Sequence, residues 1–304
     1  MKRLKVLRSF VFVFISFIAL GHNAFAQEDL TKIADNVYAY VDTKKSLPQN
    51  SFGANAGIII GRDGIVVVDT LVSAKEAKRL IGDIRKVSGL PIKYVVNTHY
   101  HLDHTFGNAE FEKLGAVIIS HVNDDQNMRK NGEPTLKDVK EFGLSEDDMQ
   151  GTVLAYPSLT FNDRMGIDIG NQKIELIYTW NSHTNGSIVV YVPDKKILFA
   201  GDILFTNYHP FIAEGDINSW LKALDQIMNF DVDKIIPGHG PVSGKKDIED
   251  MKNYLILFDK EAELLSSRSK DIEYVLNEIK KALPNRDEGE WLIKTNLQMK
   301  YLKE

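Results

Sequence analysis

The sequence predicts an α+β protein folded as a layered sandwich. Three observations support this fold class: short Val- and Ile-rich segments typical of strands, amphipathic segments typical of helices, and the order of strands followed by a helix in both halves of the chain. Strands and helices with one apolar face must bury it against a second layer. With 304 residues, 43% hydrophobic and 26% charged, the chain has the composition of a soluble globular protein with a sizeable core.

The first 26 residues have the features of a secretory signal peptide. Lys and Arg gather in the first eight positions, residues 10–20 are an almost unbroken apolar run, and Ala24 and Ala26 form an A-x-A-type cleavage site. The run is shorter than the roughly 20 residues that a membrane-spanning helix needs. We therefore expect residues 1–26 to be removed and residues 27–304 to form one domain. The protein is then exported, periplasmic or secreted, without a stable membrane anchor.

Charge and cysteine content restrict the partners and the possible ligands. Loss of the leader takes away four Lys and Arg residues and no acidic residue, which leaves 33 basic against 42 acidic residues and a net charge of −9. Such a chain lacks the basic face that nucleic-acid phosphates require, so a small-molecule substrate is the expected partner. The chain has no cysteine. Any metal must therefore be held by imidazole and carboxylate groups.

The first half of the mature chain predicts strands and one helix. The helix at 73–87 places Ala77, Leu80 and Ile84 on one face, and Pro91 stops it. The strands are short apolar or alternating runs bounded by Gly, Asp and Pro. They are expected at 36–42, 55–61, 64–70, 92–98 and 116–120.

Residues 121–157 differ in character, because they are polar, helix-prone in pieces and interrupted by Gly and Pro. We interpret them as a helical flap inserted between the two halves of the fold. Apolar residues of the flap such as Met128, Leu136 and Phe142 either face a greasy substrate or pack on the body of the protein.

The second half predicts strands at 164–170, 172–179, 186–193 and 196–202, a helix at 217–228 and a further strand at 233–238. Residues 245–304 are charged and helix-prone, so we expect a C-terminal helical extension.

The stretch "NTHYHLDH" at 97–104 concentrates groups that bind metal ions. At the end of a strand, His99 and His101 are two residues apart and should point to the same side, with Tyr100 pointing to the other. Asp103 and His104 follow as the chain turns. Imidazole and carboxylate ligands suit zinc, and also iron or manganese.

Three further candidate ligands lie at predicted strand ends in the second half. His183 in "NSHTNGS" precedes a strand, Asp202 in "FAGD" follows one, and His239 in "IPGHG" follows another. Because strand ends gather at one edge of a sandwich, these side chains are expected to meet the first group there.

The motifs "HYHLDH", "SHTNG", "AGD" and "PGHG" occur in the order in which the metallo-β-lactamase superfamily carries them, and the chain resembles that superfamily from about residue 36 to 243. The resemblance implies a four-layer αββα sandwich with two metal ions, usually zinc, at one edge. It assigns His99, His101 and His183 to one metal, Asp103, His104 and His239 to the other, and Asp202 to a bridge between them.

The resemblance also implies a hydrolytic mechanism. Two cations would lower the pKa of a bound water so that hydroxide attacks an acyl or phosphoryl centre, with Asp103 as the catalytic residue that accepts or shuttles a proton. Thr98, Thr184 and Asn108 are candidates for orienting the imidazoles. Trp180 is expected to pack beneath the site.

The substrate class follows from a departure from the commonest β-lactamase group. That group has a cysteine where this chain has Asp202, and a lysine a few residues later, whereas residues 203–207 contain none. The bridging aspartate is more similar to thioesterases, lactonases and esterases. We expect an exported zinc hydrolase of esters, lactones or thioesters, with Tyr208, His209 and Phe211 shaping the pocket.

Three alternatives remain open at this stage. A true β-lactamase would hydrolyse β-lactam amides. An iron-dependent oxidoreductase of the same fold would use oxygen chemistry. A metal-binding protein without turnover would only sequester the ion.

Overall fold

Two β-sheets packed face to face form the centre of the molecule in the computed structural model, which describes residues 30–41 and 46–303. The predicted signal peptide lies outside these residues. Strands β1 to β4 of the first sheet run antiparallel to their neighbours, and β4 to β7 run parallel. In spatial order this sheet contains β1 (Leu30–Ala34), β2 (Val37–Tyr40), β3 (Ala56–Ile60), β4 (Ile65–Val68), β5 (Ile92–Val96), β6 (Val117–His121) and β7 (Leu159–Phe161).

The second sheet has five strands in the order β12-β11-β10-β9-β8. Only the β11–β12 pair is parallel. Its strands are β8 (Arg164–Asp168), β9 (Lys173–Tyr178), β10 (Ile188–Val192), β11 (Ile197–Phe205) and β12 (Lys234–His239).

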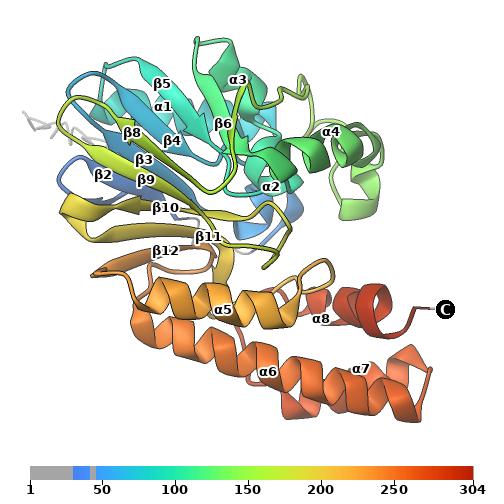
Figure 1. Ribbon diagram of the computed structural model, residues 1–304. Helices are drawn as coiled ribbons and strands as arrows, with labels where there is room; N and C mark the ends of the chain where they lie inside the picture. The colour runs from blue at the N-terminus through green and yellow to red at the C-terminus, as the bar shows by residue number, and fades with distance from the viewer. Residues whose placement is uncertain (1–29, 42–45, 304) are drawn as a thin grey trace, which may run out of the picture.

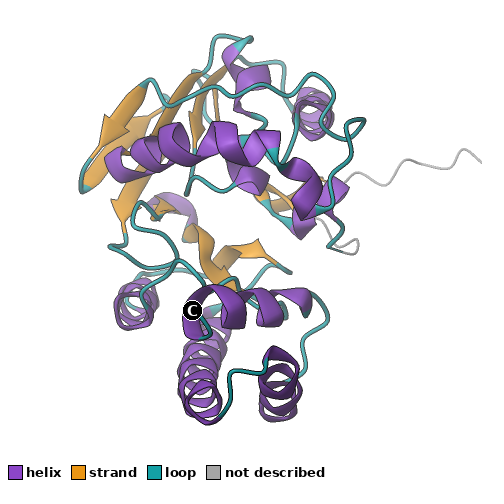
Figure 2. Cartoon of the chain, turned by 90° about the vertical axis from the view of Figure 1, so that its right-hand side faces the viewer, coloured by secondary structure: helices purple, strands orange, loops and turns teal. Residues whose placement is uncertain are grey.

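Helices cover the outer face of each sheet, as Figures 1 and 2 show. On the first sheet, Leu80 and Ile84 of α1 pack against buried strand residues such as Val67. On the second, Trp220 of α5 and Phe258 of α6 are buried in one core. The helices are α1 (Ala74–Val87), α2 (Leu102–Thr105), α3 (Asn108–Glu112), α4 (Val122–Lys137), α5 (Ile217–Met228), α6 (Lys245–Arg268), α7 (Ile272–Ala282) and α8 (Trp291–Asn296).

A core between the two sheets completes the four layers. Ile59 and Val66 of the first sheet and Leu176 and Val190 of the second are each less than 2% exposed and belong to one cluster. Burial of this apolar surface on both sides of each sheet is the main stabilising contribution to the fold. The predicted αββα sandwich is thereby confirmed.

The predicted strands and helices match the observed elements closely, but two strands were missed. Strand β1 lies at the edge of the sheet and buries only Ile33 fully, and β7 has three residues and buries only Phe161. Neither presents the sustained apolar run or clean alternation that identifies a strand in a sequence.

The segment at 121–157 packs most of its apolar side chains on the body of the protein, whereas Phe142 is 41% exposed. Met128 of α4 is fully buried, and Leu144 and Met149 belong to a buried cluster with Phe52 and Phe106. Most polar side chains of α4 are exposed or half-buried, but Asp124 is fully buried. Of the two explanations offered for these apolar residues, the structure favours packing over contact with a greasy substrate.

The region from residue 245 contains α6, α7, α8 and a final turn at Leu297–Tyr301; α6 packs against α5 and β11, and residues of α7 and α8 join the same core. Among the residues that the structure describes, no helix is both long and apolar enough to cross a bilayer.

Candidate metal centre

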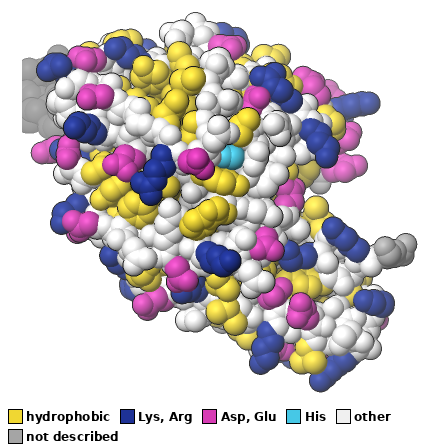
Figure 3. Space-filling model, viewed as in Figure 1, with side chains coloured by type: hydrophobic (Ala, Val, Ile, Leu, Met, Phe, Trp, Pro, Cys, Tyr) yellow, Lys and Arg dark blue, Asp and Glu magenta, His cyan; other side chains and the backbone are white. Residues whose placement is uncertain are grey.

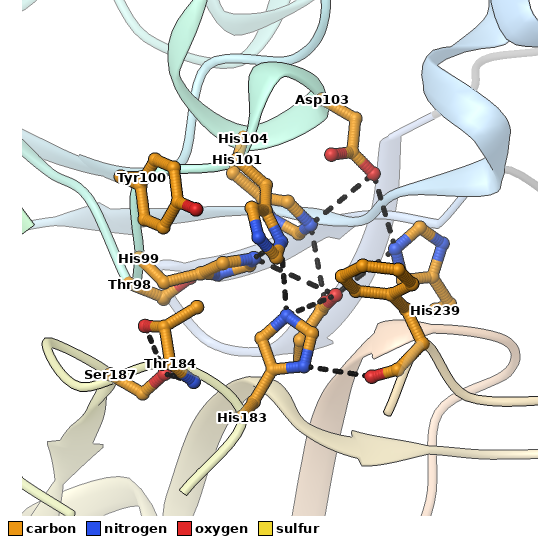
Figure 4. Close-up of polar contacts among 12 residues, drawn as sticks. Thr98, His99, Tyr100, His101, Asp103, His104, His183, Thr184, Ser187 and His239 are labelled. Atoms are coloured by element: carbon orange, nitrogen blue, oxygen red, sulfur yellow. Dashed lines mark hydrogen bonds and ion pairs between the residues drawn. The ribbon is translucent and has the colours of Figure 1, made fainter. Parts of the chain in front are cut away.

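The predicted ligands meet where several loops leave the same edge of the two sheets (Figure 4). β5 ends at Val96, and the chain that follows carries His99 and His101 before α2 begins at Leu102. His183 lies in the loop between β9 and β10. This edge therefore collects side chains from distant parts of the sequence.

The local geometry differs from the sequence expectation at four residues. His99 and His101 lie beyond the end of β5 rather than within a strand. Tyr100 does not pack in an apolar layer, because its hydroxyl donates a 2.5 Å hydrogen bond to Glu214. Asp202 lies inside β11 and not after it. It sits at an interruption of the β11–β12 register next to Gly201, whose φ of +50° favours glycine.

Asp202 stands between two groups of donors. Its Oδ2 lies 3.6 Å from His99 Nε2 and 3.3 Å from His183 Nε2. Its Oδ1 lies 3.2 Å from His104 Nε2 and 3.5 Å from His239 Nε2. The two oxygens of one carboxylate thus face different imidazole pairs.

Two donor sets surround this carboxylate. In the first, His101 Nδ1 lies 3.0 Å from Nε2 of both His99 and His183. In the second, Asp103 Oδ2 lies 3.3 Å from His239 Nε2 and 3.6 Å from His104 Nε2. Within each set all ligand atoms lie within 4.8 Å of one another; the sets are His99, His101, His183 and Asp202, and Asp103, His104 and His239.

Each of the five imidazoles is oriented by its second ring nitrogen. Carbonyl and carboxylate oxygens only accept hydrogen bonds, so in four of the imidazoles they fix the outer nitrogen as the protonated one and leave the inner nitrogen as a ligand. The Thr98 hydroxyl does the same for His99, because it donates its own hydrogen to Asp69 and can only accept from the imidazole. The outer contacts are His99 Nδ1 to Thr98 Oγ1 at 3.1 Å, His101 Nε2 to Glu214 at 3.4 Å, His104 Nδ1 to Asp69 at 2.9 Å, His183 Nδ1 to the Phe211 carbonyl at 3.2 Å and His239 Nδ1 to the Phe52 carbonyl at 3.2 Å.

The donor set fits a divalent metal. His104 Nε2 and Asp202 Oδ1 are buried without a hydrogen-bond partner, although buried polar atoms normally have one. Burial lowers the pKa of His183 to about 3, which keeps this imidazole in the neutral form that binds metal. Metal coordination would satisfy the orphaned atoms and offset the charge of the carboxylates.

Asp69 contacts a candidate ligand, a role that the sequence did not indicate. It accepts from the Thr98 backbone N–H and hydroxyl, both at 2.7 Å, and from His104 Nδ1. Its backbone has a φ of 61°, a left-handed conformation that is rare for a residue other than glycine. The only signal was its position after the apolar run of β4, where an aspartate also suits an ordinary turn.

Phe52 also has a left-handed backbone conformation, with a φ of 52°. Its carbonyl accepts from His239 Nδ1 and from the Tyr208 hydroxyl at 2.9 Å. Backbone conformations of this kind cost of order 1–3 kcal/mol each and gather at functional sites. Here they place a carbonyl and a carboxylate (Asp69) behind two candidate ligands.

Glu214 is a second missed residue. Burial alone would raise the pKa of its carboxyl, but the nearby His101 and Tyr100 outweigh burial and lower it to about 2. A charged carboxylate therefore faces the outer nitrogen of His101 at neutral pH. Nothing in the sequence around "AEGD" marked this glutamate.

The predicted pocket residues occupy different environments. Phe211 is half-buried, and its ring centroid lies 5.6 Å from that of His101. Tyr208 is buried, with its ring 4.9 Å from His239. His209 is buried, and its Nδ1 lies 2.7 Å from the Tyr254 hydroxyl. The structure brings Phe211 and Tyr208 to the ligands and directs His209 into the C-terminal helices.

Only one of the residues expected to orient the imidazoles does so in the structure. Of the three proposed from sequence, Thr98 contacts a ligand imidazole, whereas Asn108 bonds to Thr70 and Asn97 and Thr184 bonds to Ser187. Trp180 was expected beneath the site, but it is 47% exposed. That place is taken by Trp220, whose ring lies 5.2 Å from His183.

The C-terminal region reaches the centre through one asparagine. Asn296 of α8 is 1% exposed, donates to the Pro210 carbonyl at 2.8 Å and accepts from the Ile212 N–H at 2.7 Å. These two contacts fix the backbone on either side of Phe211. The Phe211 carbonyl in turn orients His183. No periodic pattern in the sequence points to this role.

An αββα sandwich with two adjoining sets of imidazole and carboxylate donors at one edge defines a metal-dependent protein class. A family model of the metallo-beta-lactamase superfamily matches residues 50–239. The chain belongs to the metallo-β-lactamase superfamily, whose members are mostly metal-dependent hydrolases, and its candidate metal-binding His and Asp groups agree with that membership.

Curated relatives include two enzymes with different substrates. The chain is 27% identical over 222 residues to a linear primary-alkylsulfatase of Pseudomonas sp. (strain ATCC 19151). This match covers 62% of this chain but only 42% of the relative. It is 25% identical over 228 residues to the metallo-beta-lactamase type 2 of Elizabethkingia meningoseptica, and this match covers 72% of this chain and 83% of the relative.

Solved structures show the same fold. The metallo-beta-lactamase from Pontibacter korlensis superposes with a TM-score of 0.61 at 21% identity, over 75% of this chain and 98% of that chain. The DIM-1 metallo-beta-lactamase superposes with a TM-score of 0.60 at 20% identity, over 75% and 96% of the two chains.

Proposed function

We propose that the protein is an exported hydrolase that uses two zinc ions to cleave a carboxylic acid derivative of the ester, lactone or thioester class. The observation that carries this proposal is the position of Asp202, whose two carboxylate oxygens face the two donor sets separately. A carboxylate in that position suits a pair of cations better than a single one.

The chemistry divides between the metals and the chain. When bound, a pair of divalent cations supplies a water of lowered pKa as the nucleophile and positive charge for the developing oxyanion. His99, His101 and His183 would hold one cation, and Asp103, His104 and His239 the other, with Asp202 shared.

Asp103 is the residue placed to move a proton. Its side chain is 11% exposed, so it borders solvent more than Asp202 does at 4%. Burial alone would raise the pKa of Asp103, but His104 and His239 lower it on balance. The carboxylate is therefore ionised and able to accept a proton from the nucleophile or return it to the leaving group.

The ester, lactone and thioester class is preferred because Asp202 stands where the commonest β-lactamases have cysteine, and because residues 203–207 provide no lysine for the carboxylate of a β-lactam. β-Lactam hydrolysis is the second candidate. It is favoured by the relative from Elizabethkingia meningoseptica, of which the match covers 83%.

The first test is elemental analysis of residues 27–304 purified without added metal or chelator. We expect about two zinc ions per chain, followed by turnover in a panel containing an ester, a lactone, a thioester, a β-lactam and an alkyl sulfate. Asp202→Asn should lose metal and turnover together, whereas Asp194→Asn, an exposed position away from the centre, should retain both. Iron as the main metal would contradict the proposal, and turnover of the β-lactam alone would select the second candidate.

Export is tested separately. Expression of residues 1–304 in a bacterial host, followed by fractionation and N-terminal sequencing, should give a periplasmic or secreted product that begins at Gln27. A cytoplasmic product that retains Met1 would contradict the export proposal without touching the hydrolase proposal.

A further inference from the structure

A polar cleft of about 390 Å³ lies beside the candidate metal centre, on the side of His101. Its lining includes Asn127, Asn131, Asn181, Asn185, Tyr100 and Glu214. No lysine or arginine side chain contributes to the lining. In the view of Figure 3 one histidine patch lies beside an acidic patch.

Helix α4 forms one wall of this cleft. Asn127 and Asn131 are four residues apart and therefore lie on the same face of the helix. Met128, which follows Asn127 in the sequence, is fully buried. Asparagine in a helix interior is less favourable than alanine by several tenths of a kcal/mol. Helix stability therefore does not account for this pair.

Hydrogen bonds hold the opposite walls at a fixed separation. Asn127 donates from its carboxamide to the side chain of Asn185, and Asn123 donates to the Asn185 carbonyl at 2.9 Å. Asn131 and Tyr100 line the same cleft. Each carboxamide offers two donors and two acceptor positions, so these contacts leave capacity for a ligand.

Glu214 connects the cleft to the metal centre. Its carboxylate accepts from the Tyr100 hydroxyl and lies 3.4 Å from His101 Nε2, while His101 Nδ1 faces the other ligands. A molecule seated in the cleft would therefore touch the residues that orient a candidate ligand.

We propose that this cleft binds an uncharged substrate portion that carries hydroxyl or carboxamide groups, while the scissile bond lies at the metal centre. The proposal rests on the proposed function, which it deepens by naming the substrate class. Carboxamides donate and accept, so they match hydroxyl and amide groups. A carboxylate or sulfate is disfavoured, because Glu214 would repel it and the lining offers no cation.

The test uses three 4-nitrophenyl esters of equal chain length whose acyl chains end in a carboxamide, a methyl group or a carboxylate. With the metal-loaded protein, we expect kcat/KM for the carboxamide ester to exceed that for the methyl ester by about 3- to 10-fold, as one or two hydrogen bonds allow. The carboxylate ester should be the poorest substrate.

Two substitutions at Asn131 separate recognition from misfolding. Asn131→Leu should remove the advantage of the carboxamide ester. Asn131→Lys places a cation in the lining and should raise the carboxylate ester above the methyl ester, a gain that loss of structure cannot produce. Gln126→Lys adds the same charge at an exposed position of α4 outside the lining, and should leave the substrate order unchanged.

Binding provides a readout that does not need turnover. Hydroxamates with the same three tails are measured by calorimetry, and we expect the same order and the same reversal in Asn131→Lys. Hydrolysis without any dependence on the tail would overturn the cleft proposal and leave the proposed function standing. If hydroxamate binding depends on the tail but no ester is hydrolysed, the cleft proposal stands and the proposed function is overturned.

Discussion

The Asp69 carboxylate lies 2.9 Å from Nδ1 of His104, and the same carboxylate accepts from the backbone and the hydroxyl of Thr98. Because the Thr98 hydroxyl donates to Asp69, its oxygen is left to accept from Nδ1 of His99 at 3.1 Å. One buried carboxylate therefore sets the orientation of an imidazole in each donor set. This contact links the two halves of the centre from behind.

Asp69→Asn should weaken metal binding. The amide keeps the size of the side chain but turns an N–H group toward groups that already donate. We expect a loss in zinc affinity of about 10- to 100-fold, the usual effect of removing a partner that orients a metal-binding histidine. Competition with a chromogenic chelator measures it. Asp83→Asn on α1, where the largely buried Asp83 carboxylate pairs with Lys86 and belongs to neither donor set, is the matched control, and equal affinities in the two variants would refute the role of Asp69.

Asn296→Ala should destabilise the protein and loosen His183. The substitution leaves the Pro210 carbonyl and the Ile212 N–H without their partner in a buried position. We expect a loss of about 1–3 kcal/mol in the free energy of unfolding, measured with urea, together with weaker zinc binding. Thr295→Ala on the same helix is the control. Loss of stability with unchanged zinc affinity would show that Asn296 supports the fold without positioning the ligand.

Removal of metal should lower the melting temperature. The centre buries the carboxylates of Asp103 and Asp202 among five imidazoles, and metal binding to the folded chain stabilises it by mass action. At a free metal concentration about 1,000 times Kd the stabilisation is about 4 kcal/mol. Calorimetric scans with and without chelator test this, and identical scans would mean that no metal was held before chelation.

Much of the fold and the ligand set could be predicted from sequence because both rest on local patterns. Short Val- and Ile-rich runs locate the buried strands, and the crowded imidazoles at 99–104 stand out in a chain with few histidines. Even so, Asp202 was expected after a strand and lies within β11. The extra residues in the β11–β12 register depend on the partner strand, which local composition does not reveal.

The parts that could not be predicted depend on contacts between distant segments. The carbonyls of Phe52 and Phe211 orient His239 and His183, yet every residue has a carbonyl and the sequence cannot distinguish these two. Glu214 meets His101 across 113 positions. Trp220 rather than Trp180 packs against His183, because α5 folds its apolar face over the second sheet.

His209 should make stability depend on pH. Burial, and then the nearby Arg286, lower the pKa of its imidazole from 6.5 to about 4. Between these values the unfolded chain binds a proton that the folded chain does not, so the contribution is complete above pH 6.5 and is lost as the pH falls toward 4. The full loss is up to about 3 kcal/mol.

The measurement compares wild type with His209→Gln. Both proteins are freed of metal first, because metal release at low pH would otherwise change the stability as well. Glutamine can still pair with the Tyr254 hydroxyl, which contacts His209 Nδ1 at 2.7 Å, but it does not titrate. Urea unfolding at pH 7 and pH 4.5 should show a smaller fall in stability for the variant than for wild type. An equal fall in both proteins would mean that His209 is protonated in the folded chain as readily as in the unfolded one. Burial of His209 beside Arg286 would then not be the origin of a loss of stability at low pH.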